Sequence, residues 1–125
     1  MNRKMRNKLK LSLVDTSCPR ADDLLFLGRG RSDPLALRIM AAVAENVGWE
    51  VDDILQSQDI ENIKSKIINL RSELVGFTTV TSNINSSLKL ALELKKSRPE
   101  LITVFGGYHA TALPEDLLQF PQVDY

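Results

Sequence analysis

The chain has 125 residues and a mass of 14.0 kDa, enough for one domain with its own core. The charges of its 16 basic and 16 acidic residues cancel, so the formal net charge is zero. This argues against a nucleic-acid-binding domain, because affinity for the phosphate backbone needs a clustered basic face. Cys18 is the only cysteine, which excludes a disulfide framework and a cysteine-held metal centre within the chain and favours a reducing, cytoplasmic setting.

The basic residues are concentrated at the start of the chain. Five of them lie in the first ten positions: Arg3, Lys4, Arg6, Lys8 and Lys10. We interpret residues 1–8 as a solvated tail, with RNA or anionic lipid as the alternative contact, and residues 9–125 as the domain. The longest apolar stretch, Leu35 to Val47, contains charged residues and falls short of the ~20 residues of a membrane span, so no membrane partner is expected.

The first half of the chain predicts two strands and two helices. A strand over Leu9–Val14 is followed by a turn-rich loop from Cys18 to Ser32. Asp33 and Pro34 form an N-cap and first-turn pair for a helix that Gly48 ends. The apolar residues that recur at helical spacing in it are Leu35, Ile39, Ala42, Val43 and Val47. Trp49 to Leu55 predicts an edge strand, and Asp59 caps the second helix.

The second half continues the alternation. The buried stripe of the second helix is predicted to be Ile60, Ile63, Ile67 and Leu70. A central strand begins at Leu74, and a helix runs from about Asn83 to Ser97 with Ile84, Leu88, Ala91 and Leu92 on its core face. Leu101 to Phe105 is the fourth strand, Pro114 to Phe120 a short helix, and Val123 to Tyr125 the start of a fifth strand.

Alternating strands and helices predict an α/β protein: a flavodoxin-like three-layer sandwich around a parallel sheet of about five strands. The fifth strand would be truncated after Tyr125, which would leave the sheet edge open. We therefore expect the chain to be a fragment of a longer protein.

Two strand-to-helix turns carry the candidate ligand-binding residues. Small polar groups follow the third strand at Thr78, Thr79, Thr81 and Ser82, and a flexible turn follows the fourth at Gly106, Gly107, Tyr108 and His109. In an open parallel sheet such turns lie side by side at the carboxyl ends, where ligands bind. About half of the hydroxyls are expected to serve the fold, whereas a side chain at Gly107 is expected to enter the ligand space.

Catalytic machinery is not predicted. His109 is the only histidine, and no nucleophile, base and acid occur together, so no catalytic residue and no metal ligand are assigned. Cys18 has no basic neighbour in sequence and is interpreted as passive. The turn at Gly106 and Gly107 matches neither the dinucleotide fingerprint nor a phosphate-binding P-loop.

These segments resemble the N-terminal cobalamin-binding domain of cobalamin-dependent radical S-adenosylmethionine enzymes. The segment from Leu74 to Thr81 resembles the family's valine-glycine-x-serine or threonine strand, with a further threonine three residues on. The segment from Phe105 to Glu115 is similar to its glycine-glycine-x-histidine-alanine-threonine segment. The resemblance covers roughly Leu9 to Tyr125 and is specific from Leu74 onward.

The resemblance implies a flavodoxin-like fold that holds the corrin over the carboxyl ends of the strands, with the nucleotide tail running toward the sheet. Thr78, Thr81, Gly106 and Gly107 would line the tail and the corrin edge, with Tyr108 and His109 close by. The family chain continues into a barrel whose Cys-x-x-x-Cys-x-x-Cys motif holds a 4Fe–4S cluster for S-adenosylmethionine chemistry, typically methyl transfer or another radical reaction. That barrel would be the partner within the parent protein, and this chain alone is expected not to turn over.

One departure from the pattern of cobalamin-binding domains concerns the protein ligand of the cobalt ion. Cobalamin domains of the methionine-synthase type carry Asp-x-His-x-x-Gly after the first strand, whereas here the stretch from Asp15 to Arg20 contains neither histidine nor glycine. Cobalamin bound base-off and without a histidine ligand is therefore expected. A phosphoacceptor receiver domain is disfavoured, because Thr78 stands where it needs an aspartate. An interaction or structural module that has lost cobalamin is the alternative.

Overall fold

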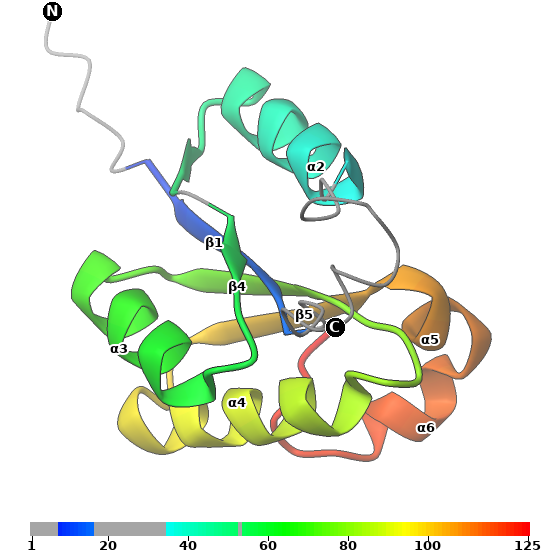
Figure 1. Cartoon of the computed structure of the whole chain (residues 1–125). Helices are drawn as coiled ribbons and strands as arrows, with labels where there is room; N and C mark the ends of the chain where they lie inside the picture. Colours follow the sequence, from blue (N-terminus) through cyan, green and yellow to red (C-terminus); the bar gives the residue numbers. More distant parts are fainter. Residues whose placement is uncertain (1–7, 17–34, 53) are drawn as a thin grey trace, which may run out of the picture.

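The computed structural model describes residues 8–16, 35–52 and 54–125. In this part of the chain a parallel sheet lies between helices on its two faces (Figure 1). The strands are β1 (Lys10–Asp15), β2 (Glu50–Val51), β3 (Leu55–Gln56), β4 (Leu74–Thr78) and β5 (Ile102–Gly106). The helices are α2 (Leu35–Asn46), α3 (Ile60–Leu70), α4 (Ile84–Ser97), α5 (Gly107–Ala112) and α6 (Pro114–Leu118). None of these helices is long and apolar enough to cross a membrane.

The strand order is that of a doubly wound sheet. It runs β2-β1-β4-β5, with β3 also paired to β1, and every pairing is parallel. After β1 the chain moves to one side of the sheet and later returns to place β4 on the other side of β1. This reversal produces a switch point at the carboxyl ends of β1 and β4, where ligands of such sheets bind. The predicted flavodoxin-like α/β fold is confirmed.

The predicted edge strand over Trp49–Leu55 is only partly correct. The edge is made of two short pieces, β2 and β3, which pair with opposite ends of β1. Asp52, a residue type that strands disfavour, lies where β2 ends, although its amide still donates to the Leu11 carbonyl at 3.2 Å. The edge position of this segment is confirmed, and the interruption leaves little continuous edge for another strand to join.

The larger core lies between the sheet and the helices α3 and α4. Phe77 and Phe105 stack here with their ring centroids 4.7 Å apart. The predicted burial of Ile63 and Ile67 is confirmed. In α4 the prediction for Leu92 is wrong, since this side chain is 39% exposed. Leu90 and Leu94 are buried instead, because Leu92 lies about 100° round the helix from Ala91 and turns away from the sheet.

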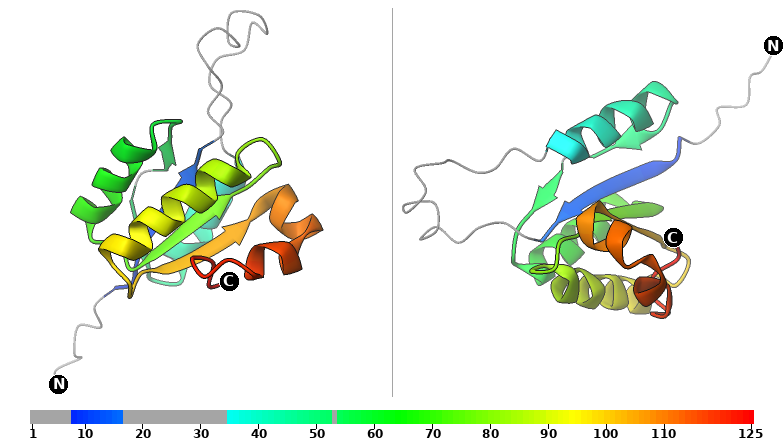
Figure 2. Two further views of the ribbon diagram at one scale, coloured as in Figure 1. Left: turned by 90° about the horizontal axis from the view of Figure 1, so that it is seen from below. Right: turned by 90° about the vertical axis from the view of Figure 1, so that its right-hand side faces the viewer.

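The smaller core lies under α2, on the opposite face of the sheet (Figure 2). Leu37 and Ala44 pack on Leu11 and Leu13 of β1. The apolar positions that predicted this helix do not form its buried face. Leu35, Ile39, Val43 and Val47 are each more than half exposed. The buried face of α2 is instead the side that carries Leu37 and Ala44, and the small Ala44 lets the helix approach the sheet closely. The predicted cap at Asp33 and Pro34 lies outside the described residues.

The segment after α6 returns to the sheet beside β5. The Tyr125 amide donates to the Thr103 carbonyl at 3.2 Å, and the Phe105 amide donates to the Tyr125 carbonyl at 2.8 Å. These two hydrogen bonds are the pattern of a parallel pair. Although the segment is not assigned as a strand, the backbone pairing matches the predicted start of a fifth one. Asp124 fixes it further, since its Oδ2 accepts from Lys95 Nζ at 2.5 Å.

We expect Asp124 to make stability depend on acid pH. Burial raises the pKa of its carboxyl, but hydrogen bonds from Lys95 and the Thr103 amide outweigh this and lower it below 3.8. Because the folded-state pKa is depressed, this stabilisation is complete above the unfolded value and is lost as pH falls through the folded one. Asp124→Asn should flatten the decline of the melting temperature as pH falls from about 5 toward the folded pKa, and should leave the slope between neutral pH and about pH 5 unchanged. Parallel melting curves for the two proteins would contradict this role.

Candidate cofactor-binding site

The carboxyl ends of β4 and β5 form one joined structure. Thr78 is in register with Gly106, and the Thr79 amide and hydroxyl both donate to the Gly106 carbonyl at 2.8 Å. The His109 amide donates to the Thr79 carbonyl at 3.0 Å. The sequence placed these two turns side by side, and the structure brings them within hydrogen-bonding distance.

Gly107 has a structural role that differs from the expected one. Its φ is +90°, and an added Cβ would lie 2.7 Å from both the amide nitrogen and the carbonyl oxygen of Thr79. A side chain here would therefore press on the neighbouring backbone instead of entering open ligand space, so that expectation was wrong. No loop separates β5 from the next helix, since β5 ends at Gly106 and α5 begins at Gly107. Glycine is needed because the chain turns from strand to helix without a loop.

Thr79 also serves the fold. Its side chain is fully buried and its hydroxyl is used by the Gly106 carbonyl, so the hydroxyl cross-links the two strand ends. One of the four predicted hydroxyls thus stabilises the joined turns, where about half were expected to do so. This leaves Thr78, Thr81 and Ser82 as the hydroxyls at this edge for a ligand.

The other residues that were predicted to bind a ligand lie at the carboxyl ends of β4 and β5 and are partly or fully accessible. Thr81 and Ser82 are exposed, and Thr78 and His109 are half-buried. Tyr108, in the first turn of α5, is 85% exposed. A Cβ added to Gly106 would meet only the Phe77 carbonyl, at 3.8 Å, so this residue leaves room for close approach to the main chain. Hydroxyls, an open glycine and an aromatic ring thus border the same edge.

Asn83 is the site residue that the sequence did not reveal. Its side-chain oxygen accepts from the Val80 amide at 2.8 Å, and its Nδ2 donates to the Thr78 carbonyl at 3.1 Å. It is 3% exposed and makes no side-chain cap bond to α4, although it is the residue directly before that helix. Asn83 instead closes the turn from Thr78 to Ser82 and so positions its hydroxyls.

The end of β1 joins the same polar region. The Thr16 hydroxyl is buried and lies 3.0 Å from the Ser87 hydroxyl of α4. It also donates to the Asn83 carbonyl at 3.4 Å. The first loop after Thr16, including Cys18, lies outside the described residues. In the described part of the chain, no group of three histidine, cysteine, aspartate or glutamate side chains is arranged to hold a metal ion.

A separate cleft of about 930 Å³ lies at the β2–β3 edge of the sheet, between α2 and α3. Arg38 and Glu45 of α2 line one wall, and Asn62 and Lys66 of α3 line the other. None of the residues predicted to bind a ligand contributes to it. The cleft is also at the far edge from β5, so we base the candidate site on the joined turns and not on the size of this hollow.

Comparison with known proteins agrees with this architecture. Residues 28–125 match the B12 binding domain family. A stretch of 75 residues is 29% identical to an anaerobic magnesium-protoporphyrin IX monomethyl ester cyclase from Rubrivivax gelatinosus. The match covers 59% of this chain and 14% of that enzyme, so the chain spans a small part of the relative's length.

The doubly wound sheet, with joined turns after β4 and β5, is of the flavodoxin-like type, in which cofactors bind at the carboxyl ends of the strands. The chain belongs to the B12 binding domain family, since the match covers well over half of its residues.

Proposed function

We propose that this domain binds cobalamin over the carboxyl ends of β4 and β5, without a histidine on cobalt. The observation that carries the proposal is the joined pair of turns, in which Thr79 cross-links the strand ends while Gly106 stays open. Thr78, Thr81 and Ser82 would hydrogen-bond polar groups of the nucleotide tail or corrin amides. Tyr108 would lie against the corrin edge, with Gly107 shaping the turn and His109 close by.

The residues present fit such a group. Along the face of β4 and β5 that looks toward α2, small residues lead from the edge into the sheet: Gly76, Thr78 and Gly106. A Cβ on Gly76 would meet Leu13 Cδ2 at 3.0 Å, so its small size is needed for packing under α2, whereas Gly106 faces open space. The nucleotide tail of cobalamin could thus approach the backbone of β5 more closely than that of β4.

When bound, cobalamin supplies cobalt–carbon chemistry, such as methyl transfer, which the side chains of this protein cannot perform. The protein's own residues bind and orient the cofactor. Supported by the motif resemblance, we further propose that the parent protein is a radical S-adenosylmethionine enzyme of the cytoplasm, with a 4Fe–4S cluster in a separate barrel. The relative's small matched share is in keeping with a larger parent.

The absence of a histidine ligand can be tested cleanly, because His109 is the only histidine in the chain. We expect hydroxocobalamin to bind, with the same absorbance spectrum in the native protein and in His109→Ala. We propose that the cofactor's own dimethylbenzimidazole base is also off cobalt, so after reduction to cob(II)alamin the electron paramagnetic resonance lines should show no nitrogen splitting. A nitrogen-split spectrum that His109→Ala abolishes would overturn the ligand assignment.

The location of the site needs a second set of variants. Thr81→Ala and Ser82→Ala should each weaken cobalamin binding about 3- to 10-fold, the value of one or two neutral hydrogen bonds. Ser65→Ala, at an exposed position of α3, is the matched control and should leave affinity unchanged. If the folded native protein fails to bind cobalamin at high micromolar concentration, the module that has lost its cofactor becomes the better interpretation.

A further inference from the structure

Two buried hydroxyls beside the candidate site exceed what packing requires. The hydroxyl of Thr16, directly after β1, and that of Ser87 in α4 lie 3.0 Å apart, and these residues are 3% and 0% exposed. Taking a hydroxyl out of water costs free energy unless it is hydrogen-bonded. Valine and alanine have similar shapes, and replacing both partners of a buried hydrogen bond by apolar groups is often nearly neutral. The pair therefore has a role other than filling space.

The hydrogen bonds of this pair have a defined direction. Thr16 carries a single hydroxyl proton, which it donates to the Asn83 carbonyl at 3.4 Å. The Thr16 oxygen is then the acceptor of the bond between the two hydroxyls, so Ser87 supplies its proton. Together the two bonds fix the Thr16 side chain against α4 and tie the end of β1 to the backbone of Asn83.

Asn83 connects this link to the turn after β4. Its side chain closes that turn through the Val80 amide and the Thr78 carbonyl. The same turn is tied to β5, because the Thr79 hydroxyl donates to the Gly106 carbonyl. A continuous set of side-chain hydrogen bonds thus joins the carboxyl ends of β1, β4 and β5, in addition to the backbone pairing of the strands.

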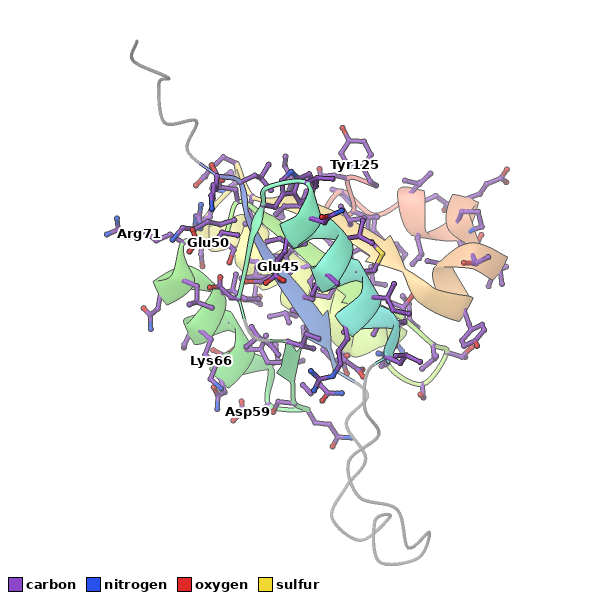
Figure 3. The ribbon with its side chains drawn as sticks, turned by 90° about the horizontal axis from the view of Figure 1, so that it is seen from above. Glu45, Glu50, Asp59, Lys66, Arg71 and Tyr125 are labelled. Atoms are coloured by element: carbon purple, nitrogen blue, oxygen red, sulfur yellow. The ribbon has the colours of Figure 1, made fainter. Side chains whose placement is uncertain are left out.

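The link lies behind the space that we assign to cobalamin. Leu11 and Leu13 of β1 pack under α2, whereas Val14 belongs to the core on the α4 side. Because side chains alternate along a strand, Thr16 points to the same side as Val14. Figure 3 looks onto the α2 side of the sheet, with α2 and its Glu45 in front of β1 and α4 behind. The hydroxyl pair can therefore hold the strand ends without occupying the space of the ligand.

We propose that Thr16 and Ser87 are positioning residues for cobalamin, which hold the end of β1 at a fixed distance from the turn after β4. This inference rests on the proposed function. The ligand crevice of a doubly wound sheet lies where the strand order reverses, which is between these two strand ends, so their separation sets its width. Hydrogen bonds are directional and fix such a separation more narrowly than apolar contacts do.

The double variant Thr16→Val with Ser87→Ala tests the proposal, because it removes both hydroxyls and keeps the packing. We expect a melting temperature close to that of the native protein, together with a loss of cobalamin affinity of about tenfold. A role in stability alone would not produce this separation of the two effects. Thr16→Ser keeps the hydroxyl and should bind cobalamin as tightly as the native protein.

The chain offers a matched control toward the amino ends of the strands. Ser12 of β1 and Ser72, which precedes β4, form a second buried pair of hydrogen-bonded hydroxyls. Ser12→Ala with Ser72→Ala removes that pair away from the ligand crevice, so cobalamin affinity should stay at the native value. An equal loss of affinity in both double variants would show a general loosening of the sheet and would overturn the positioning role.

Amide hydrogen exchange adds a measurement that needs no cobalamin. The Val80 amide, which donates to Asn83, should exchange at least about fivefold faster in the Thr16 and Ser87 double variant, while the buried Leu90 of α4 keeps its native rate. Native exchange at Val80, or native affinity in the folded double variant, would overturn the proposal. Absence of cobalamin binding by the native protein would instead refute the proposed function, and exchange at Val80 would still decide whether the pair holds the turn. Should the double variant not fold, Ser87→Ala alone replaces it in both measurements.

Discussion

Gly107→Ala is expected to destabilise the protein by about 3–5 kcal/mol. The substitution combines two costs. A φ of +90° is unfavourable for any L side chain, and the new Cβ would lie 2.7 Å from the Thr79 backbone, which would have to move. That movement would separate β4 from α5, because the Thr79 carbonyl accepts the His109 amide. Chemical denaturation monitored by circular dichroism measures the loss.

Two other glycines separate these costs. Gly48 has a φ of +92° with nothing within 4 Å of a Cβ, so Gly48→Ala reports backbone strain alone, about 1–2 kcal/mol. Gly106 has extended backbone and room for a Cβ, so Gly106→Ala should cost under about 1 kcal/mol. If Gly107→Ala cost no more than Gly48→Ala, the contact with Thr79 would not be the reason for glycine.

The same comparison locates the ligand. A side chain at Gly106 would stand in the space that we assign to cobalamin, whereas one at Gly107 would not. We therefore expect Gly106→Val to keep the fold and to lose cobalamin affinity. Unchanged affinity in a folded Gly106→Val protein would exclude close approach of the cofactor to the end of β5.

Asn83→Ala is expected to cost about 2–4 kcal/mol of stability, because it removes two hydrogen bonds at a buried position and leaves the Val80 amide and Thr78 carbonyl without them. It should also lower cobalamin affinity about tenfold or more, since the turn from Thr78 to Ser82 would lose its fixed geometry. Thermal melts and cobalamin titration of the same sample give both values.

Asn83→Asp refines the test. It keeps the oxygen that accepts from Val80 but puts a carboxylate oxygen in place of the Nδ2 donor, against the Thr78 carbonyl oxygen at a buried position. Its stability should therefore fall at least as far as that of Asn83→Ala. Asn69→Ala, at an exposed position of α3, is the control for loss of an amide. A stability of Asn83→Ala equal to that of the control would show that the turn is held by other contacts.

The sequence predicted most of the elements, because apolar periodicity and turn residues are local signals. Asp59, for example, was predicted to cap a helix, and its carboxylate accepts the Asn62 amide at 3.1 Å. The prediction that the turns after β4 and β5 meet also needed only the order of elements, since parallel strands place their carboxyl ends at one edge. The resemblance from Leu74 to Glu115 predicted the B12 binding domain family that the chain belongs to.

The directions of the side chains in α2 and in the turns could be determined only from the tertiary structure. Periodicity showed that α2 is apolar but not which apolar residues reach the sheet, because both Leu37 with Ala44 and Leu35 with Ile39 follow helical spacing. Likewise, a pair of glycines in sequence does not distinguish Gly106, which faces open space, from Gly107, which faces the Thr79 backbone. That difference depends on the approach of another strand 27 residues away in sequence, as the Thr79–Gly106 hydrogen bond records. The sequence by itself determined the elements and the edge where they meet, while long-range contacts decided which residues hold that edge together and which remain open to a ligand.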